Sequence, residues 1–343
     1  MIGENGFLIP MAAKIRQVAA QAQVSAATVS RVLNGSPSVA PAYRAQVLQA
    51  IKELDYRPNG LARHFRLQTA NVVGVLVSDV ENPHFTSMVR IIEDTVYRHG
   101  KRVLLCNSDE LPEKETAYLE MMAQDRVLGV LLSTSDPGNL GIARLLDLGI
   151  PVTAFDRLVR DPRADAVIVD NWGAGRLGTE LLLQNGHRRV GCISGPRTVQ
   201  TAADRLAGYE LAMRSAGLEP RSVSGLFRVD GACIATHELL ETTPELTAIV
   251  ATNNLMAMGV LKALNERQIV VPDRVALVAI DDPFWSELVR PRLTTLAQPI
   301  RMMAKRAVEL LFERLADRDR EARIEKFGVE LRLRESCGTL RSP

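Results

Sequence analysis

Apolar residues at helical spacing predict two short helices near the start of the chain. The inward positions of the first helix recur at i, i+3, i+4 and i+7, and they are Ile15, Val18, Ala19 and Ala22. Ser25 is then a typical N-cap, and the second helix ends at Asn34-Gly35 after the inward residues Val29, Val32 and Leu33. The pattern therefore predicts two helices joined by a tight turn.

A third helix is predicted to follow. Pro41 is suited to a first helical turn, and the apolar stripe consists of Val47, Ile51 and Leu54. A helical hairpin by itself is common in any helical region. Three helices of this size, however, form a compact head of the kind that reads DNA.

The outer face of the second helix favours DNA binding. Its side chains are small or polar, and they are Ala26, Ala27, Thr28, Ser30 and Arg31. Such a helix can lie deep in the major groove, where arginine reaches guanine or phosphate and hydroxyl groups bond phosphate oxygens. Between residues 11 and 66, eight Lys or Arg stand against Glu53 and Asp55, a net charge of +6, whereas the whole chain has +2. The positive charge is therefore local, as phosphate binding requires.

Beyond residue 66 the period changes to short apolar runs that alternate with amphipathic helices, which predicts parallel sheets covered on both faces. The runs expected as strands of a first lobe are 71–80, 102–108, 127–134, 151–156 and 166–170. Those expected in a second lobe are 189–195, 222–227, 248–253 and 275–282. This α/β body, with two doubly wound lobes, is similar to the type I periplasmic-binding-protein body. Ligands of such sheets bind at the carboxyl ends of the strands.

Length and composition agree with one head on one larger body: 343 residues, 46% of them apolar and 24% charged. The cysteines, which form no CxxC pair, are expected to be reduced core thiols: Cys106, Cys192, Cys233 and Cys337. No apolar run approaches membrane-spanning length, and residues 1–10 lack a signal-peptide pattern. We therefore expect a cytoplasmic protein without membrane association.

An enzyme with this α/β body is the competing interpretation. Gly173, Gly175 and Gly178 form G-x-G-x-x-G, but Asn171-Trp172 separate them from the strand, and no acidic residue lies between Glu180 and Asp204. We interpret this segment as a helix start whose glycines allow close packing. The five histidines show no HExxH or ligand-like pairing: His64, His84, His99, His187 and His237. No catalytic set, cofactor or metal site is expected.

The segments VSAATVSRVLNG and YRPNGLAR resemble the lactose-repressor (LacI/GalR) family of bacterial transcription regulators. ENPHF, FDR, DRLAGY, TNNLMAMG, IDD and RPRLTTLAQP follow in the family's order, so the resemblance covers nearly the whole chain. Two departures are Gln23, where the family usually has glycine in the turn, and Ala40, which replaces a Ser or Thr cap before Pro41. Both are tolerable, because a lost N-cap oxygen costs about 0.5–2 kcal/mol.

The resemblance also implies an effector pocket. Its residues are expected at His84, Phe85, Asp156, Arg157, Thr201, Arg205, Phe227, Asn254 and Asp281. Arginine donates a planar fork, Asp accepts from paired hydroxyls and Asn does both, so the set suits a vicinal diol or a small carboxylated sugar. For Phe85 and Phe227 the alternative is core filling, and for Asp156 with Arg157 it is an ordinary surface pair. Asn254 stands where relatives commonly have Asp, and Trp285 either closes the pocket or covers it.

A short segment, PNGLARHFR at residues 58–66, is expected to couple the two activities. It is too short for a stable helix alone, but two copies from a dimer could pair on DNA and become helical. Leu61 and Ala62 lie on one side with Phe65, which falls where relatives insert a leucine into the minor groove. The alternative is a flexible linker. The expected DNA-binding residues are therefore the outer residues of the second helix, Ser25 and Asn34 beside it, and Leu61, Ala62 and Phe65 of this segment.

The sequence thus predicts a homodimeric DNA-binding regulator, a repressor of a palindromic operator, controlled by a sugar or sugar derivative. The expected divisions are a possible disordered extension at 1–10, a DNA-binding domain at 11–57, a hinge at 58–70 and an effector-binding and dimerisation domain at 71–340. Alternatives are a purine-responsive or phosphoprotein-dependent regulator of the same fold and, from another class, a sugar-binding module or sugar-processing enzyme.

Overall fold

The structure is a computed structural model that describes residues 15–33, 38–54, 56 and 71–338. The chain divides into two compact units, residues 1–69 and 70–343. We call the first the head and the second the body, and each is described by itself. Among the described residues, no helix is both long and apolar enough to cross a membrane.

The head contains the three predicted helices, α1 (Ile15–Gln21), α2 (Ala26–Leu33) and α3 (Pro41–Glu53). Their inward residues form one small core around Val18, Val29 and Val47. The turn between α1 and α2 places Gln23 at a φ of 52°, which explains why glycine would suit this position. Ala40 supplies no side-chain cap to α3, and Pro41 occupies its first turn, as predicted.

The first lobe of the body is built on a parallel sheet with the strand order β11-β5-β4-β3-β1-β2. Its strands are β1 (Val72–Val77), β2 (Arg102–Asn107), β3 (Gly129–Leu132), β4 (Val152–Phe155), β5 (Asp165–Val169) and β11 (Ile324–Phe327). Its helices are α5 (Pro83–Arg98), α6 (Pro112–Gln124), α7 (Leu140–Asp147) and α12 (Ile300–Ala316). Helices α5 and α12 bury one face of the sheet, and α6 and α7 bury the other.

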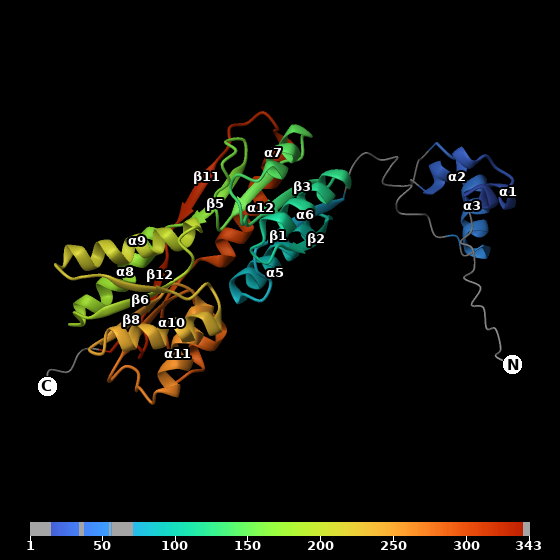
Figure 1. Cartoon of the computed structure of the whole chain (residues 1–343). Coiled ribbons are helices and arrows are strands. Elements are labelled where there is room, and N and C mark those ends of the chain that lie inside the picture. Colours follow the sequence, from blue (N-terminus) through green and yellow to red (C-terminus); the bar gives the residue numbers. More distant parts are fainter. Residues whose placement is uncertain (1–14, 34–37, 55, 57–70, 339–343) are drawn as a thin grey trace, which may run out of the picture. The chain divides into compact units, whose positions relative to one another are not determined.

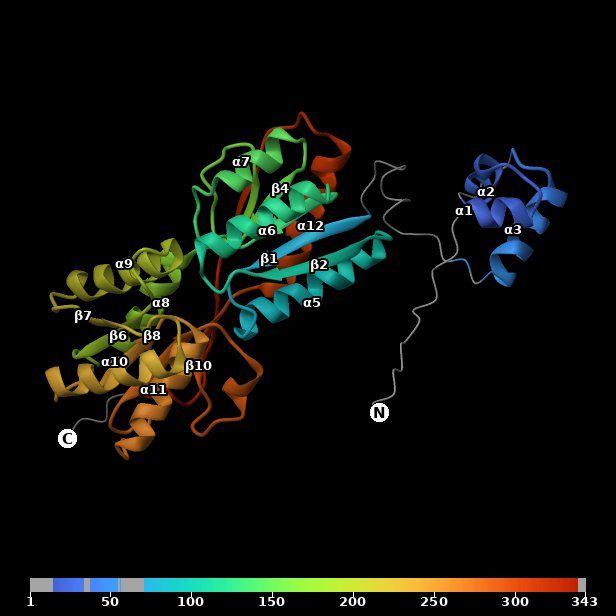
Figure 2. The ribbon, with the colours of Figure 1, turned by 45° about the vertical axis from the view of Figure 1, so that its right-hand side comes forward.

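The second lobe has the matching order β12-β10-β9-β8-β6-β7, in which only the pairing of β12 is antiparallel. Its strands are β6 (Val190–Ser194), β7 (Arg221–Ser224), β8 (Ala248–Ala251), β9 (Ala276–Ile280), β10 (Thr294–Ala297) and β12 (Glu330–Arg332). Its helices are α8 (Asn171–Gln184), α9 (Gln200–Ser215), α10 (Val229–Thr242) and α11 (Asn254–Glu266), with a short 3-10 helix at Phe284–Glu287. The chain crosses between the lobes after β5, after β10 and after β11 (Figures 1 and 2).

Two details of the strand prediction were wrong. The run 222–227 ends as a strand at Ser224, because Leu226 and Phe227 have φ angles of 55° and 57° and turn the chain out of the sheet. The short strands β10 and β11 were not predicted. Each has only four residues, and β11 is partly exposed, so neither forms a clear apolar run.

The glycine-rich segment begins helix α8, as interpreted from the sequence. Asp170 caps the helix by accepting from the Gly173 amide at 3.2 Å. A Cβ on Gly175 would lie 1.9 Å from the Arg205 carbonyl oxygen, and one on Gly208 would lie 2.1 Å from that of Trp172. The glycines therefore allow α8 and α9 to pack closely, which confirms the packing interpretation.

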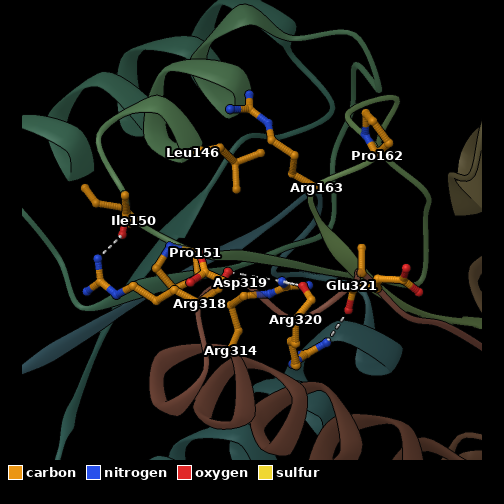
Figure 3. Close-up of a pocket in the computed structure, with 12 residues that line it drawn as sticks. Leu146, Ile150, Pro151, Pro162, Arg163, Arg314, Arg318, Asp319, Arg320 and Glu321 are labelled. Atoms are coloured by element: carbon orange, nitrogen blue, oxygen red, sulfur yellow. Dashed lines mark hydrogen bonds between the residues drawn. The ribbon is translucent and has the colours of Figure 1, made fainter.

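A cavity of about 630 Å³ lies in the first lobe, at the edge where strands β4, β5 and β11 begin (Figure 3). Four arginines line it: Arg163, Arg314, Arg318 and Arg320. Arg314 and Arg320 both pair with the fully buried carboxylate of Asp165, at 3.1 and 2.8 Å, and Arg163 pairs with Asp147 and Asp161. These charges are thus largely balanced within the protein, and the arrangement holds α12 to the start of β5.

Candidate functional site

The candidate site lies between the two lobes, where the carboxyl ends of the parallel strands meet. Residues that line it follow β1, β2 and β4 in the first lobe and β6, β7, β8, β9 and β10 in the second. The full lining is Asp79, Asn82, His84, Phe85, Glu110, Asp156, Arg157, Thr201, Arg205, Phe227, Asn253, Asp281 and Gln298. The structure therefore brings together eight of the nine residues expected in an effector pocket.

The cavity between these residues is small and polar. Its volume is about 30 Å³, room for only about one or two water molecules. Because a monosaccharide is several times larger, it can enter only if the lobes or the lining side chains move apart.

His84 and Asp156 face each other across the first lobe's part of the site. His84 Nε2 lies 3.4 Å from Asp156 Oδ1, and both ring nitrogens are buried without a hydrogen-bond partner. The Phe85 ring stands edge-on to the imidazole, with 5.1 Å between centroids. Burial by itself lowers the pKa of His84, but the negative charges of Asp156 and Asp281 outweigh it and hold that pKa above its ordinary value. An imidazole with two unused nitrogens can donate to or accept from a bound hydroxyl.

Arg205 is fixed by two hydrogen bonds within the second lobe. Its Nε donates to Asn171 Oδ1 and its Nη1 to the Thr252 carbonyl oxygen, both at 2.7 Å. The same helix, α9, also contributes Thr201 to the lining. The guanidinium is therefore held in place before any ligand binds, so little rotamer entropy is lost on binding.

Arg157 lines the cavity but already has a carboxylate partner within the protein. Both of its terminal nitrogens donate to the Glu110 carboxylate, at 2.6 and 2.7 Å. Its planar fork is therefore already paired and is not open to a ligand carboxylate. Burial also excludes the alternative that Asp156 and Arg157 form an ordinary surface pair.

Asn254 lies behind Asp281 and is not part of the cavity lining. Its Nδ2 donates to Asp281 Oδ2 at 3.0 Å and to Asn82 Oδ1, in the other lobe, at 2.9 Å. Asp281 Oδ1 accepts from Gln298 Nε2 at 2.6 Å. Asn254 and Gln298 therefore hold the Asp281 carboxylate from both sides, and a direct contact of Asn254 with a ligand stays a prediction.

A second contact between the lobes is the ion pair of Arg228 with Asp79. Arg228 Nη1 lies 2.6 Å from Asp79 Oδ2, and the Asp79 side chain is only 6% exposed. Together with the Asn82–Asn254 hydrogen bond, this pair joins the first turn after β1 to the starts of α10 and α11.

The aromatic residues are divided between the cavity and the core. Phe85 lines the cavity and also packs in the core of the first lobe, and Phe227 lines it from the second lobe while contacting that lobe's core. Both functional and core interpretations therefore apply to these two rings. Trp285 packs against the second lobe's core and does not line the cavity.

Sequence reasoning missed the lining residues Asp79, Asn82, Glu110, Asn253 and Gln298. Asp79 and Asn253 lie at the ends of predicted strands, and Asn82 and Glu110 come shortly after predicted strands. The rule that ligands bind at strand ends could therefore have identified all four. Gln298 follows β10, which was not predicted, and the sequence therefore carried no comparable signal for it.

The candidate DNA-reading residues lie on or beside α2. Ser25 Oγ accepts from the Thr28 amide at 3.1 Å, so Ser25 caps the helix. Ala26, Ala27 and Arg31 are exposed, whereas Thr28 and Ser30 are half-buried. The other expected residues, Asn34, Leu61, Ala62 and Phe65, lie outside the described residues, as do residues 1–10 and the expected hinge at 58–70.

The fold and the site together define a class: DNA-binding regulators with a two-lobed, ligand-binding body. Residues 14–59 match the family described as bacterial regulatory proteins, lacI family, and residues 179–337 match the periplasmic binding protein-like domain. The chain is 36% identical to the ribose operon repressor of Halalkalibacterium halodurans, over 94% of this chain and 96% of that protein. It is 33% identical to the repressor PurR of Vibrio atlanticus, over 96% and 99%.

Among solved structures, the body and head together are similar to a complex of the transcriptional regulator CelR with cellobiose. The TM-score is 0.71 at 32% identity, with 94% of this chain and 99% of that chain covered. The protein belongs to the lacI family of bacterial regulatory proteins. It is therefore a transcriptional regulator, as its sequence predicted.

Proposed function

We propose that this regulator is a homodimeric repressor whose affinity for a palindromic operator is controlled by a neutral sugar bound between the lobes. The observation that carries the proposal is the convergence of Asp156, Arg205 and Asp281 from both lobes on one small cavity. Carboxylates accept from paired hydroxyls, and a fixed guanidinium donates to ring or hydroxyl oxygens.

The charges at the site favour a neutral ligand over a sugar acid or phosphate. Glu110 neutralises Arg157, and Arg228 neutralises Asp79. This leaves two carboxylates, Asp156 and Asp281, against the single guanidinium of Arg205 and the imidazole of His84. A bound anion would meet at least as much negative as positive charge among buried side chains, where an unbalanced charge is costly.

A purine base is the second candidate ligand. Phe85 and Phe227 line the cavity from opposite lobes, and an aromatic base could contact both rings. PurR of Vibrio atlanticus, similar over nearly the full length, supports this alternative. The ribose operon repressor and the CelR–cellobiose complex support the sugar.

The head supplies the proposed DNA contacts. Ala26 and Ala27 leave the start of α2 narrow, and Arg31 is exposed near its end, so the helix fits the major groove. A palindromic site needs two such heads, which is the reason for proposing a dimer. We infer a cytoplasmic protein that acts by binding rather than by catalysis, because its partner is DNA and its relatives are repressors.

A binding screen tests the ligand. Neutral sugars, sugar acids and purine bases are added to the full chain in thermal-shift experiments, where a ligand at a hundredfold excess over its Kd stabilises by about 2.7 kcal/mol. We expect a neutral sugar to stabilise the protein. Stabilisation only by a purine would support the second candidate, and stabilisation only by sugar acids would contradict the charge argument.

A truncation tests the regulator. Residues 67–343 alone should keep ligand binding and lose binding to operator sequences that the full chain selects from random duplexes. Sedimentation of the full chain at micromolar concentration should give a dimer. A monomer, or DNA binding that survives the truncation, would contradict the proposal.

A further inference from the structure

A cluster of three potential metal ligands lies outside the cleft, where α10 and α11 pack side by side (Figure 1). Cys233 and His237 are four residues apart on α10 and therefore share one helix face. Glu266, the last residue of α11, faces both of them. A Cys–His pair at this spacing differs from the HExxH pattern of two histidines.

The distances within the cluster are close to those of a tetrahedral metal site. Glu266 Oε2 lies 3.6 Å from Cys233 Sγ and 2.9 Å from His237 Nε2, and the three ligand atoms all lie within 4.8 Å of one another. Around a tetrahedral Zn²⁺, bonds of about 2.0–2.3 Å place neighbouring ligand atoms about 3.3–3.6 Å apart. Small side-chain adjustments are enough to reach that arrangement.

We propose that Cys233, His237 and Glu266 bind a zinc-class divalent cation. Thiolate, imidazole and carboxylate are the ligands that Zn²⁺ takes, and the thiolate disfavours Mg²⁺ and Ca²⁺, which prefer oxygen. The site is accessible, because the side chains of His237 and Glu266 are 29% and 48% exposed. With three protein ligands, water fills the fourth position.

Binding requires a proton rearrangement in which Arg267 is the competitor. Arg267 Nε donates to His237 Nδ1 at 2.7 Å, so in this arrangement the ring proton is on Nε2 and points to Glu266. A cation on Nε2 needs the proton on Nδ1, and the Cys233 thiol must release its proton to solvent. Arg267 then leaves the imidazole and keeps its ion pair with Glu241. The metal therefore competes with the hydrogen bonds of His237 to Arg267 and to Glu266 and with one thiol proton.

Cobalt titration of the full chain without an affinity tag tests the site. We expect one equivalent of Co²⁺ to produce a thiolate-to-cobalt charge-transfer band, and Zn²⁺ to displace it. Cys233→Ser should lose the band. His237→Gln and Glu266→Gln should weaken Zn²⁺ binding at least about tenfold, because even outer-shell changes have effects of this size.

Matched controls separate this site from unspecific binding. Glu238→Gln changes the exposed neighbour of His237, and Cys106→Ser removes a thiol of the other lobe, so both should bind as the wild type does. Arg267→Met should bind more tightly, because the competing donor is gone. A charge-transfer band that survives in Cys233→Ser, unchanged affinity in His237→Gln, or lost binding in Arg267→Met would overturn the proposal.

Discussion

Asp156 and Asp281 occupy equivalent positions in the two lobes. Each directly follows the third strand of its sheet, β4 or β9, and each has a positive φ, 66° and 75°. The amide of Asp156 donates to the carbonyl oxygen of Val167 in the neighbouring strand β5. The amide of Asp281 donates to the carbonyl oxygen of Leu296 in the neighbouring strand β10, and both distances are 3.0 Å. Positive φ is uncommon outside glycine but least unfavourable for Asp and Asn. The two lobes therefore present one carboxylate each to the cleft through the same local backbone geometry.

Replacing Asp281 with Ala should weaken effector binding. The change removes an acceptor from the cavity and leaves the Gln298 and Asn254 amides without their partner. An unpaired buried polar group costs about 1–3 kcal/mol, and calorimetry should show a correspondingly higher Kd. Basal operator binding should survive, and Glu238→Ala on the surface of the same lobe should change neither property. Wild-type effector affinity in Asp281→Ala would place the ligand elsewhere.

His84 should make stability depend on pH. Its folded pKa is raised above the ordinary value of 6.5, so its stabilising effect is complete below about pH 6.5 and is lost as pH rises through the folded pKa. The free energy of unfolding of the wild type, relative to His84→Gln, should therefore fall as pH rises through this window in urea titrations.

His187 provides a control of opposite sign. Its partial burial lowers its pKa, so the stability of the wild type relative to His187→Gln should rise with pH up to about 6.5. If the two differences in the free energy of unfolding changed in the same direction with pH, the contact with Asp156 would not govern the charge of His84.

The ion pair between Arg228 and Asp79 should favour the closed cleft. After an effector has entered, the cleft must close over it again, and Arg228→Ala leaves the buried Asp79 carboxylate without its cationic partner in that closed form. Effector binding should therefore weaken, by up to about tenfold because Arg228 is itself partly exposed. Asp79→Asn removes the same attraction. The double variant should lose less than the sum of the single variants. Strictly additive losses, measured by calorimetry, would show that the two side chains act separately.

Asp165 should contribute strongly to the stability of the first lobe. Asp165→Asn keeps the side chain's shape but leaves the buried charges of Arg314 and Arg320 without a carboxylate. Breaking such a buried pair costs about 3–5 kcal/mol, which urea denaturation should register as a lower midpoint with an unchanged slope. Asp147→Asn removes the exposed partner of Arg163 and should cost less than about 1 kcal/mol. Equal effects of the two changes would contradict this assignment.

Arg31→Ala should abolish specific operator binding without affecting the fold, because Arg31 is exposed on α2. Footprinting at the wild-type concentration should show no protection, while thermal unfolding stays unchanged. Arg98→Ala removes the same charge from an exposed position on α5 and should bind as the wild type does. Wild-type binding should weaken with salt, each neutralised phosphate contributing about −0.9 to the log–log slope.

The sequence alone was sufficient for features that depend on local spacing. The head helices follow from apolar residues at i, i+3 and i+4, and most strands follow from continuous apolar runs. The resemblance to the lactose-repressor family indicated most of the cavity lining, including Asp156, Arg205 and Asp281. The strand prediction agrees with it, because parallel strands bring their carboxyl ends to one edge.

Only the tertiary structure decided which partner each polar side chain has. Arg157 pairs with Glu110, 47 residues away, and Asn254 donates to Asn82, 172 residues away, and the sequence indicated neither partner. The left-handed backbone at Leu226 and Phe227 likewise ended a run that continued as apolar in the sequence. Hydrogen bonds and ion pairs depend on distance and angle in space, and these are set by the packing of two lobes that the chain crosses three times, not by spacing along the chain.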